Sequence, residues 1–118
     1  MQAPIQHLNT AAFADAVRDG ITVVDFWAAW CGPCRAMAPQ FEKAATLAPQ
    51  YRFAKVDVDA EPELAARFQV RSIPTLMVFA DGEPVAAQAG TMSAEQLVSA
   101  VDRVVARTTT TPPVAHAV

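Results

Sequence analysis

The chain is poor in cysteine and glycine and has no long hydrophobic run. Only 2 of its 118 residues are cysteine, and they lie too close together for the spread disulfide framework of a small secreted protein. No stretch of about 18 apolar residues is present, which argues against a transmembrane helix. The 4 glycines form no phosphate-binding loop, so we expect no nucleotide site and no bound cofactor.

Charge of one sign is not concentrated either. The 9 Lys and Arg side chains and the 12 Asp and Glu side chains give a net charge of −3, with no basic run. This pattern argues against nucleic acid or an anionic membrane as a partner. Residues 1–7 have neither the basic start nor the apolar run of a secretory signal, so we expect a cytoplasmic protein.

The composition is that of a folded domain followed by a tail. Hydrophobic residues make up 53% of the chain and charged residues 18%, which favours a packed core in a single domain. The composition changes after Arg107, where four threonines and two prolines follow. We therefore expect one domain over residues 1–107 and a flexible Thr/Pro-rich tail over residues 108–118.

Hydrophobic periodicity predicts the element order β-α-β-α-β-α-β-β-α. We expect strands over residues 5–8, 21–27, 53–58, 75–80 and 84–89, and helices over residues 10–19, 34–48, from 62 and from 93. The early strands require parallel crossovers, whereas the last two strands form a hairpin at Asp81-Gly82. The fold class is α/β, with a mixed central sheet and helices on both faces.

Two cysteines flank Gly32-Pro33 where a predicted strand gives way to a helix. We expect Cys31 at the exposed helix N-terminus and Cys34 one turn further in. The partial positive charge of a helix N-terminus favours thiolate, so Cys31 is predicted to be the nucleophile. Cys34 would then attack the resulting mixed disulfide and release the substrate.

Two other interpretations of the cysteine pair are weaker. Zinc usually takes four ligands, and the only histidines are His7 and His116, near the two ends of the chain. We therefore expect no metal site. A pair of inert buried thiols is disfavoured by the Gly-Pro between the cysteines and by their place at a strand-to-helix turn.

Two charged residues interrupt apolar strands. Asp25 follows Val23-Val24 and precedes Phe26-Trp27, and burial there would raise the pKa of its carboxyl group. The alternative is a strand-end carboxylate that faces solvent. Lys55 lies within the strand over residues 53–58. From sequence alone, an edge lysine with its amine in water is almost as plausible there as a lysine embedded in the sheet.

The segment Trp27-Ala-Ala-Trp-Cys-Gly-Pro-Cys34 resembles the active site of the thioredoxin family. The similarity covers about residues 5–106 and continues through Asp25, Pro39, Lys55, Ile73-Pro74-Thr75, Gly82 and Gly90. Ser72 and Arg35 depart from the family, which often has glycine and lysine there. Neither departure changes the sulfur chemistry.

The resemblance implies a thioredoxin fold and a protein-disulfide reductase. The redox-active disulfide would be Cys31–Cys34, and electrons would come from NADPH through a separate thioredoxin reductase. The partners would be that reductase and disulfide-containing client proteins, and the chain would be a monomer. Asp25 would exchange a proton with Cys34, Lys55 would modulate Asp25, and a cis Pro74 would dock the substrate backbone.

The resemblance also implies a flat apolar surface around Cys31 that accepts varied protein segments. We expect this surface to comprise Trp30, Gly32, Pro33, Ile73, Ala89 and Gly90. Two other functions remain open for the same fold. One is a thiol oxidase or isomerase, which would need a more stable reduced form. The other is a non-catalytic subunit that docks in a larger assembly.

Overall fold

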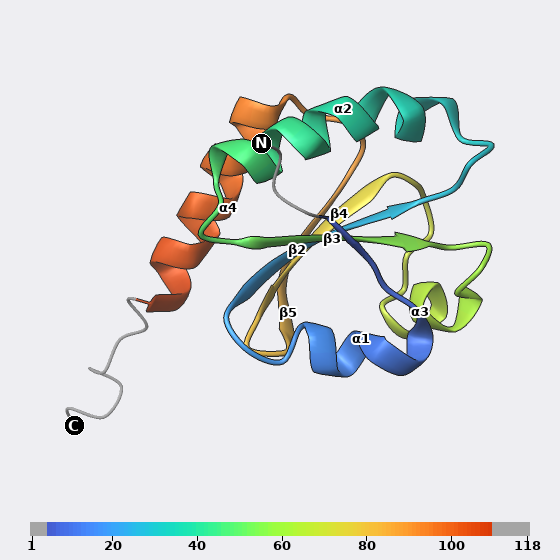
Figure 1. Cartoon of the computed structure of the whole chain (residues 1–118), viewed down its shortest axis with the longest axis horizontal. Coiled ribbons are helices and arrows are strands. Elements are labelled where there is room, and N and C mark those ends of the chain that lie inside the picture. The colour runs from blue at the N-terminus through green and yellow to red at the C-terminus, as the bar shows by residue number, and fades with distance from the viewer. Residues whose placement is uncertain (1–4, 110–118) are drawn as a thin grey trace.

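The centre of the molecule is a five-stranded mixed sheet with the strand order β1-β3-β2-β4-β5 (Figure 1). The computed structural model describes residues 5–109. The strands are β1 Gln6–His7, β2 Ile21–Trp27, β3 Arg52–Asp57, β4 Thr75–Ala80 and β5 Glu83–Ala89. Strands β1 and β2 pair in parallel with β3, and β4 pairs antiparallel with both β2 and β5. The predicted mixed sheet is confirmed.

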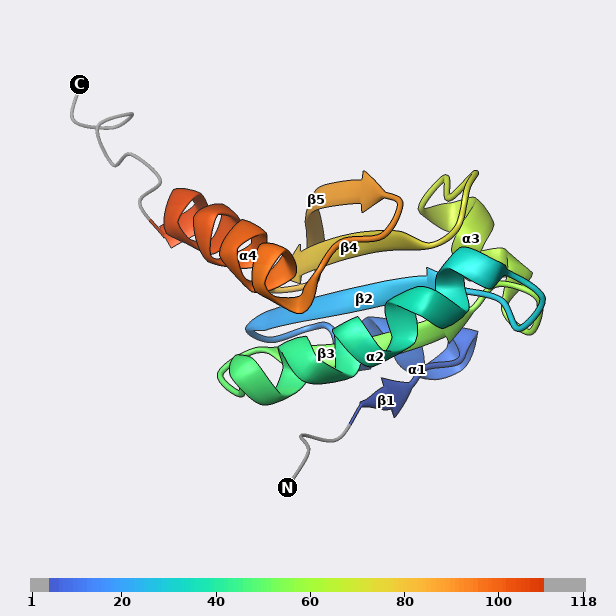
Figure 2. The same ribbon diagram turned by 90° about the horizontal axis from the view of Figure 1, so that it is seen from above.

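Helices cover both faces of this sheet. Helix α2 spans Gly32–Leu47 and α4 spans Ala94–Thr109, and the two lie on one face (Figure 2). Helix α1 spans Thr10–Ala16 and α3 spans Pro62–Arg67, and these lie on the other face. Residues 28–31 connect the end of β2 to the start of α2. No helix over residues 5–109 is long and apolar enough to cross a membrane.

Alternation along β2 divides the core into two layers. Val23 packs in one cluster with Met37 and Phe41 of α2. Val24 and Phe26 point the opposite way and pack in a second cluster with Phe13 of α1. Successive side chains of a strand point to opposite faces, so the position of a residue in β2 tells which helix layer its side chain meets.

The helix ends differ in part from the predicted ones. Helix α1 is capped by Asn9, whose side chain accepts the Ala12 N–H at 2.8 Å, but it ends at Ala16 rather than near Asp19. A turn of residues 17–20 follows, in which Gly20 has φ +74°. This positive φ favours glycine and turns the chain into β2.

The last helix begins as predicted but continues further. Its predicted capping box is present, because Ser93 and Gln96 exchange hydrogen bonds at 3.0 and 3.1 Å. The helix continues to Thr109, two residues past the composition change at Arg107. Most of the predicted tail, residues 110–118, lies outside the described residues.

Candidate active site

The two cysteines form a disulfide at the N-terminus of α2. Cys31 is the N-cap residue, Gly32 and Pro33 begin the first turn, and Cys34 follows within it. The Cα atoms of the two cysteines are 5.2 Å apart. The Cys34 N–H donates to the Cys31 sulfur at 3.2 Å, so this sulfur takes the place of the usual side-chain oxygen cap. Pro33 costs no hydrogen bond here, because the first N–H groups of a helix have no intrahelical partner.

The expectation of an exposed Cys31 is wrong. Cys31 is 4% exposed and Cys34 is 2% exposed, so both are buried. The capping geometry is the cause, because it turns the Cys31 side chain back over the start of α2. Its sulfur lies 3.8 Å from the carbonyl oxygen of Ile73.

The residues predicted to surround Cys31 have unequal exposure. Trp30 is 67% exposed, and Gly32, Pro33, Ala89 and Gly90 are also exposed, whereas Ile73 is half-buried. A shallow groove of about 280 Å³ brings Trp30 and Ile73 together. The groove is also lined by Val58, Pro62, Ala65, Val70, Arg71 and Ser72, of which sequence reasoning singled out only Ser72, as a departure from the family.

A second segment, between α3 and β4, also lies beside Cys31. The Ile73–Pro74 peptide bond is cis, and Pro74 is buried. The Gly90 N–H donates to the Pro74 carbonyl at 2.9 Å. This bond joins the loop after β5 to the segment before β4, so residues far apart in sequence form one continuous rim next to the disulfide.

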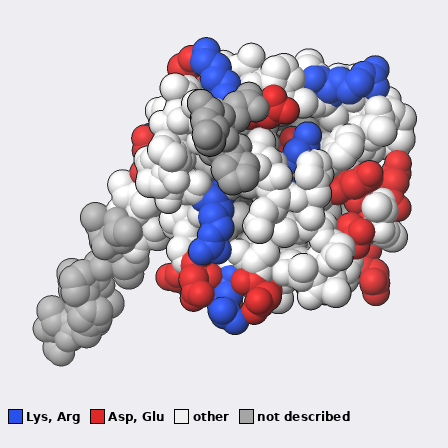
Figure 3. Space-filling view, in the orientation of Figure 1, with Lys and Arg blue, Asp and Glu red and all other residues white. Residues whose placement is uncertain are grey.

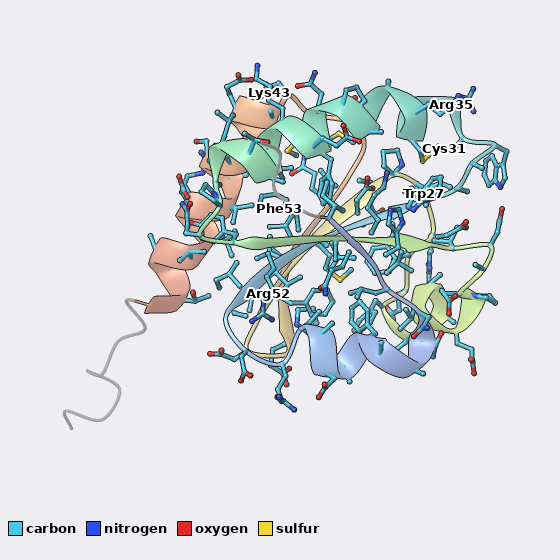
Figure 4. The ribbon with its side chains drawn as sticks, viewed as in Figure 1. Trp27, Cys31, Arg35, Lys43, Arg52 and Phe53 are labelled. Carbon is cyan, nitrogen blue, oxygen red and sulfur yellow. A yellow bond between two sulfur atoms is a disulfide. The ribbon has the colours of Figure 1, made fainter. Side chains whose placement is uncertain are left out.

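Asp25 is completely buried below α2. Alternation places its side chain on the α2 face of the sheet, between Val23 and Trp27. Val23 packs among the α2 side chains, and Trp27 packs against the cluster of Ala28, Cys31 and Cys34. Figure 4 labels Trp27 next to Cys31. Neither carboxylate oxygen has a hydrogen-bond partner among the described residues. Burial raises the pKa of Asp25 to about 6, although the charge of Lys55 acts in the opposite direction.

Lys55 lies on the neighbouring strand. It is the β3 partner of Asp25 in the parallel pairing. Its Nζ lies 4.6 Å from the centre of the Trp27 ring, a cation–π distance. Trp27 therefore contacts Lys55 and also packs against the cysteine cluster. The aspartate, the lysine and the cysteine pair that the sequence predicts as site residues thus lie in one region of the structure.

One contact at the site was not predicted. The indole N–H of Trp30 donates to the Asp59 carboxylate at 2.8 Å. Asp59 follows β3 and is 29 residues away in sequence, so no local pattern could have revealed it. The contact fixes the exposed ring over the groove.

Over residues 5–109, no group of three or more His, Cys, Asp or Glu side chains gathers in a metal-binding arrangement. Figure 3 shows Lys and Arg side chains at separate places on this face rather than in one patch. What the arrangement offers chemically is a cysteine pair that can hold or release two electrons by thiol–disulfide exchange.

The sequence is similar to those of thioredoxins. The Thioredoxin family model matches residues 4–103. A thioredoxin of Staphylococcus saprophyticus is 45% identical over 103 residues, which cover 84% of this chain and 96% of the relative. A thioredoxin of Staphylococcus aureus strain Mu50 is 43% identical over 100 residues, with the same two coverages.

Structural similarity points the same way. One similar chain comes from a study of the thiol resolving mechanism in yeast mitochondrial 1-Cys peroxiredoxin via glutathione/thioredoxin systems. It aligns with a TM-score of 0.77 and 31% identity, covering 84% of this chain and 94% of that one.

The chain therefore belongs to the thioredoxin family. It is a protein-disulfide oxidoreductase that reduces disulfides by thiol–disulfide exchange at a redox-active cysteine pair. Members of this family have no bound cofactor, and they work with a reductase and with disulfide-containing substrates.

Proposed function

We propose that Cys31 attacks the client disulfide and that Cys34 resolves the product. The reduced Cys31 thiolate attacks one client sulfur, the client S–S bond breaks, and the other client sulfur leaves as a thiolate. The Cys34 thiolate then attacks the Cys31 sulfur, which releases the second client thiolate and leaves the Cys31–Cys34 disulfide. The capping bond from Cys34 N–H to the Cys31 sulfur supports this order, because it stabilises negative charge on Cys31.

Asp25 is the proton acceptor for Cys34 in this proposal, and it returns the proton in the reverse reaction. A group that is buried and has a pKa of about 6 changes protonation close to neutral pH. Its place beneath the first turns of α2 supports transfer to Cys34, which lies within the first turn. Lys55 modulates this step, because its charge favours the ionised form of Asp25.

Client proteins dock on the rim around the disulfide. The proposed surface comprises Trp30, Gly32, Pro33, Ile73, Ala89 and Gly90. We assign the backbone before Pro74 to the client main chain, since Ile73 is half-buried and its carbonyl lies beside the Cys31 sulfur. An apolar, mostly flat rim suits extended segments of varied sequence.

Electrons reach the disulfide from NADPH through thioredoxin reductase, and the chain works as a cytoplasmic monomer. The electron source is proposed because the family has a reductase partner in general. The compartment is proposed because thioredoxins help to keep cytosolic thiols reduced. The Cys31–Cys34 disulfide at the N-terminus of α2 is the single observation that carries the proposed function.

The test is reduction of insulin in the presence of dithiothreitol, followed as turbidity. We expect the protein to accelerate precipitation well above dithiothreitol alone, and NADPH with thioredoxin reductase to replace dithiothreitol as the electron source. Turbidity that develops no faster than with dithiothreitol alone would refute the proposed activity. A redox titration that gives a strongly oxidising potential would instead assign the site to a thiol oxidase.

A further inference from the structure

The loop between β5 and α4 is held in place by side chains of the helix that carries the cysteines. The Met92 N–H donates to the Met37 sulfur at 3.5 Å, and the Ala94 N–H donates to Gln40 Oε1 at 2.8 Å. Met37 and Gln40 lie on α2, within two turns after Cys34. Helix α2 thus supplies two hydrogen-bond acceptors to the backbone that follows the proposed docking residue Gly90.

We infer that Gln40, assisted by Met37, is a positioning residue for client docking. The inference depends on the proposed role of Ala89 and Gly90 in binding client proteins. Gln40 fixes the loop relative to the disulfide, and it therefore controls how tightly a protein client binds rather than how fast the sulfurs react.

The backbone at the start of α4 shows why Gln40 is needed. The first N–H groups of a helix lack intrahelical partners. The capping box satisfies the N–H groups of Ser93 and Gln96, and it leaves that of Ala94. Ala94 is fully buried, and its N–H is satisfied by Gln40, 54 residues earlier in the sequence. Without this acceptor a buried donor is left unpaired, and the loop has to shift toward water to satisfy it.

The same loop is held from its other side. The Gly90 N–H donates to the Pro74 carbonyl in the segment beside Cys31. The loop is thus fixed between α2 and the segment around Pro74, and a shift at Ala94 passes to Gly90 through the three residues between them. Such a shift weakens the binding of a client main chain that contacts both segments. It does not affect a small disulfide that contacts only the sulfur.

A second connection between α2 and α4 offers a matched control. Lys43 Nζ and Glu95 Oε2 form an ion pair at 2.8 Å, but their side chains are 54% and 63% exposed. Exposed ion pairs contribute little, and neither residue bonds the loop backbone. Lys43→Gln removes a link between the same two helices without removing an acceptor from the loop.

The experiment compares a large and a small substrate. The KM and kcat for insulin, and the rate with the small aromatic disulfide DTNB, are measured for the wild type, Gln40→Leu, Gln40→Glu and Lys43→Gln. We expect Gln40→Leu to raise the KM for insulin about fivefold, the scale of one hydrogen bond, with kcat and the DTNB rate unchanged. Gln40→Glu keeps an acceptor at a helix N-terminus and is expected to restore the wild-type KM. Lys43→Gln is expected to match the wild type.

Amide hydrogen exchange provides a readout that does not depend on activity. Faster exchange at Met92 and Ala94 in Gln40→Leu, with α2 unchanged, would support the positioning role. An unchanged insulin KM, an equal loss with insulin and DTNB, or failure of Gln40→Glu to restore binding would overturn it. Should Gln40→Leu not fold, the volume-conserving Met37→Leu takes its place, with faster exchange expected at Met92 and a higher KM for insulin. A wild type inactive on both substrates would refute the proposed function, while the exchange measurement would still test the placement of the loop.

Discussion

Asp25 and Lys55 are directly paired across the parallel strands β2 and β3, on the face that α2 covers. Burial favours the protonated carboxylic acid, and the lysine charge favours the carboxylate. Burial has the larger effect, so the pKa of Asp25 rises to about 6. The pairing of two strands thus sets the protonation of the group proposed to serve Cys34.

Replacing Asp25 with Asn is expected to stabilise the oxidised protein at neutral pH. The pKa of Asp25 is about 6 in the folded state against an ordinary value of 3.8, so the unfolded chain ionises first as pH rises. The free energy of unfolding of the wild type therefore falls between about pH 4 and 6 and is flat above. The pKa difference corresponds to about 3 kcal/mol, the most that Asp25→Asn can regain at pH 7. Urea unfolding at pH 4 and pH 7 measures the difference.

The control for this measurement is Asp19→Asn, because the Asp19 side chain is 74% exposed. It is expected to change stability little at either pH. A stabilisation by Asp25→Asn that is the same at pH 4 and pH 7 would contradict an origin in the ionisation of Asp25.

Replacing Lys55 with Met is expected to raise the pKa of Asp25 further. The lysine charge lowers this pKa, and Met keeps the length of the side chain without the charge. Titration of the Asp25 carboxyl carbon by NMR measures the change, and the pH profile of insulin reduction is expected to move to higher pH with it. Lys43→Met, at the only other lysine, serves as the control; a lower pKa in Lys55→Met would show that the electrostatic account has the wrong sign.

The two cysteine variants are expected to behave differently toward clients. Cys34→Ser leaves the nucleophile but removes the resolving thiol, so mixed disulfides with client proteins accumulate. Cys31→Ser leaves only Cys34, whose sulfur lacks the N-cap position that stabilises a thiolate at Cys31, and is expected to trap little. Non-reducing gel electrophoresis after incubation with insulin measures the trapped species, and equal trapping by both variants would reverse the assignment of the two thiols.

Trp30→Ala is expected to weaken client binding without unfolding the protein. The ring is 67% exposed, so little core packing is lost, but the apolar rim loses its largest side chain. The KM for insulin is expected to rise several-fold, on the scale of truncating an interface aromatic, with a nearly unchanged melting temperature. Leu47→Ala, which removes another exposed large side chain at the far end of α2, is expected to leave the KM unchanged.

Much of the fold is visible in the sequence because its signals are local. The alternation of strands and helices follows from periodicity, and Ser93 with Gln96 marks the start of α4 within four residues. The burial of Asp25 is also predictable, since a strand with Val, Phe and Trp on both sides of it faces two helix layers. The cysteine pair, its place after β2 and the family are likewise recognisable from one short segment.

The remaining features depend on contacts between distant segments. The burial of Cys31 follows from a capping geometry and from the carbonyl of Ile73, 42 residues away. The indole of Trp30 reaches the Asp59 carboxylate because β3 lies beside β2. The Ala94 N–H reaches Gln40 because α4 packs on α2. Helix α1 ends at Ala16 because residues 17–20, the last part of its periodic pattern, form the turn into β2 instead. None of these partners has a fixed spacing in the sequence.

The sulfur of Cys31 belongs both to the redox couple and to the hydrogen bonding of α2. Reduction turns this acceptor into a thiolate when Cys31 ionises, and a charged acceptor binds the Cys34 N–H more strongly. By thermodynamic reciprocity, an interaction that stabilises the capped first turn more in the reduced form also shifts the equilibrium from the disulfide toward the dithiol. The stability of the first turn of α2 at Gly32 and the reduction potential of the cysteine pair are therefore linked, and a change in one changes the other.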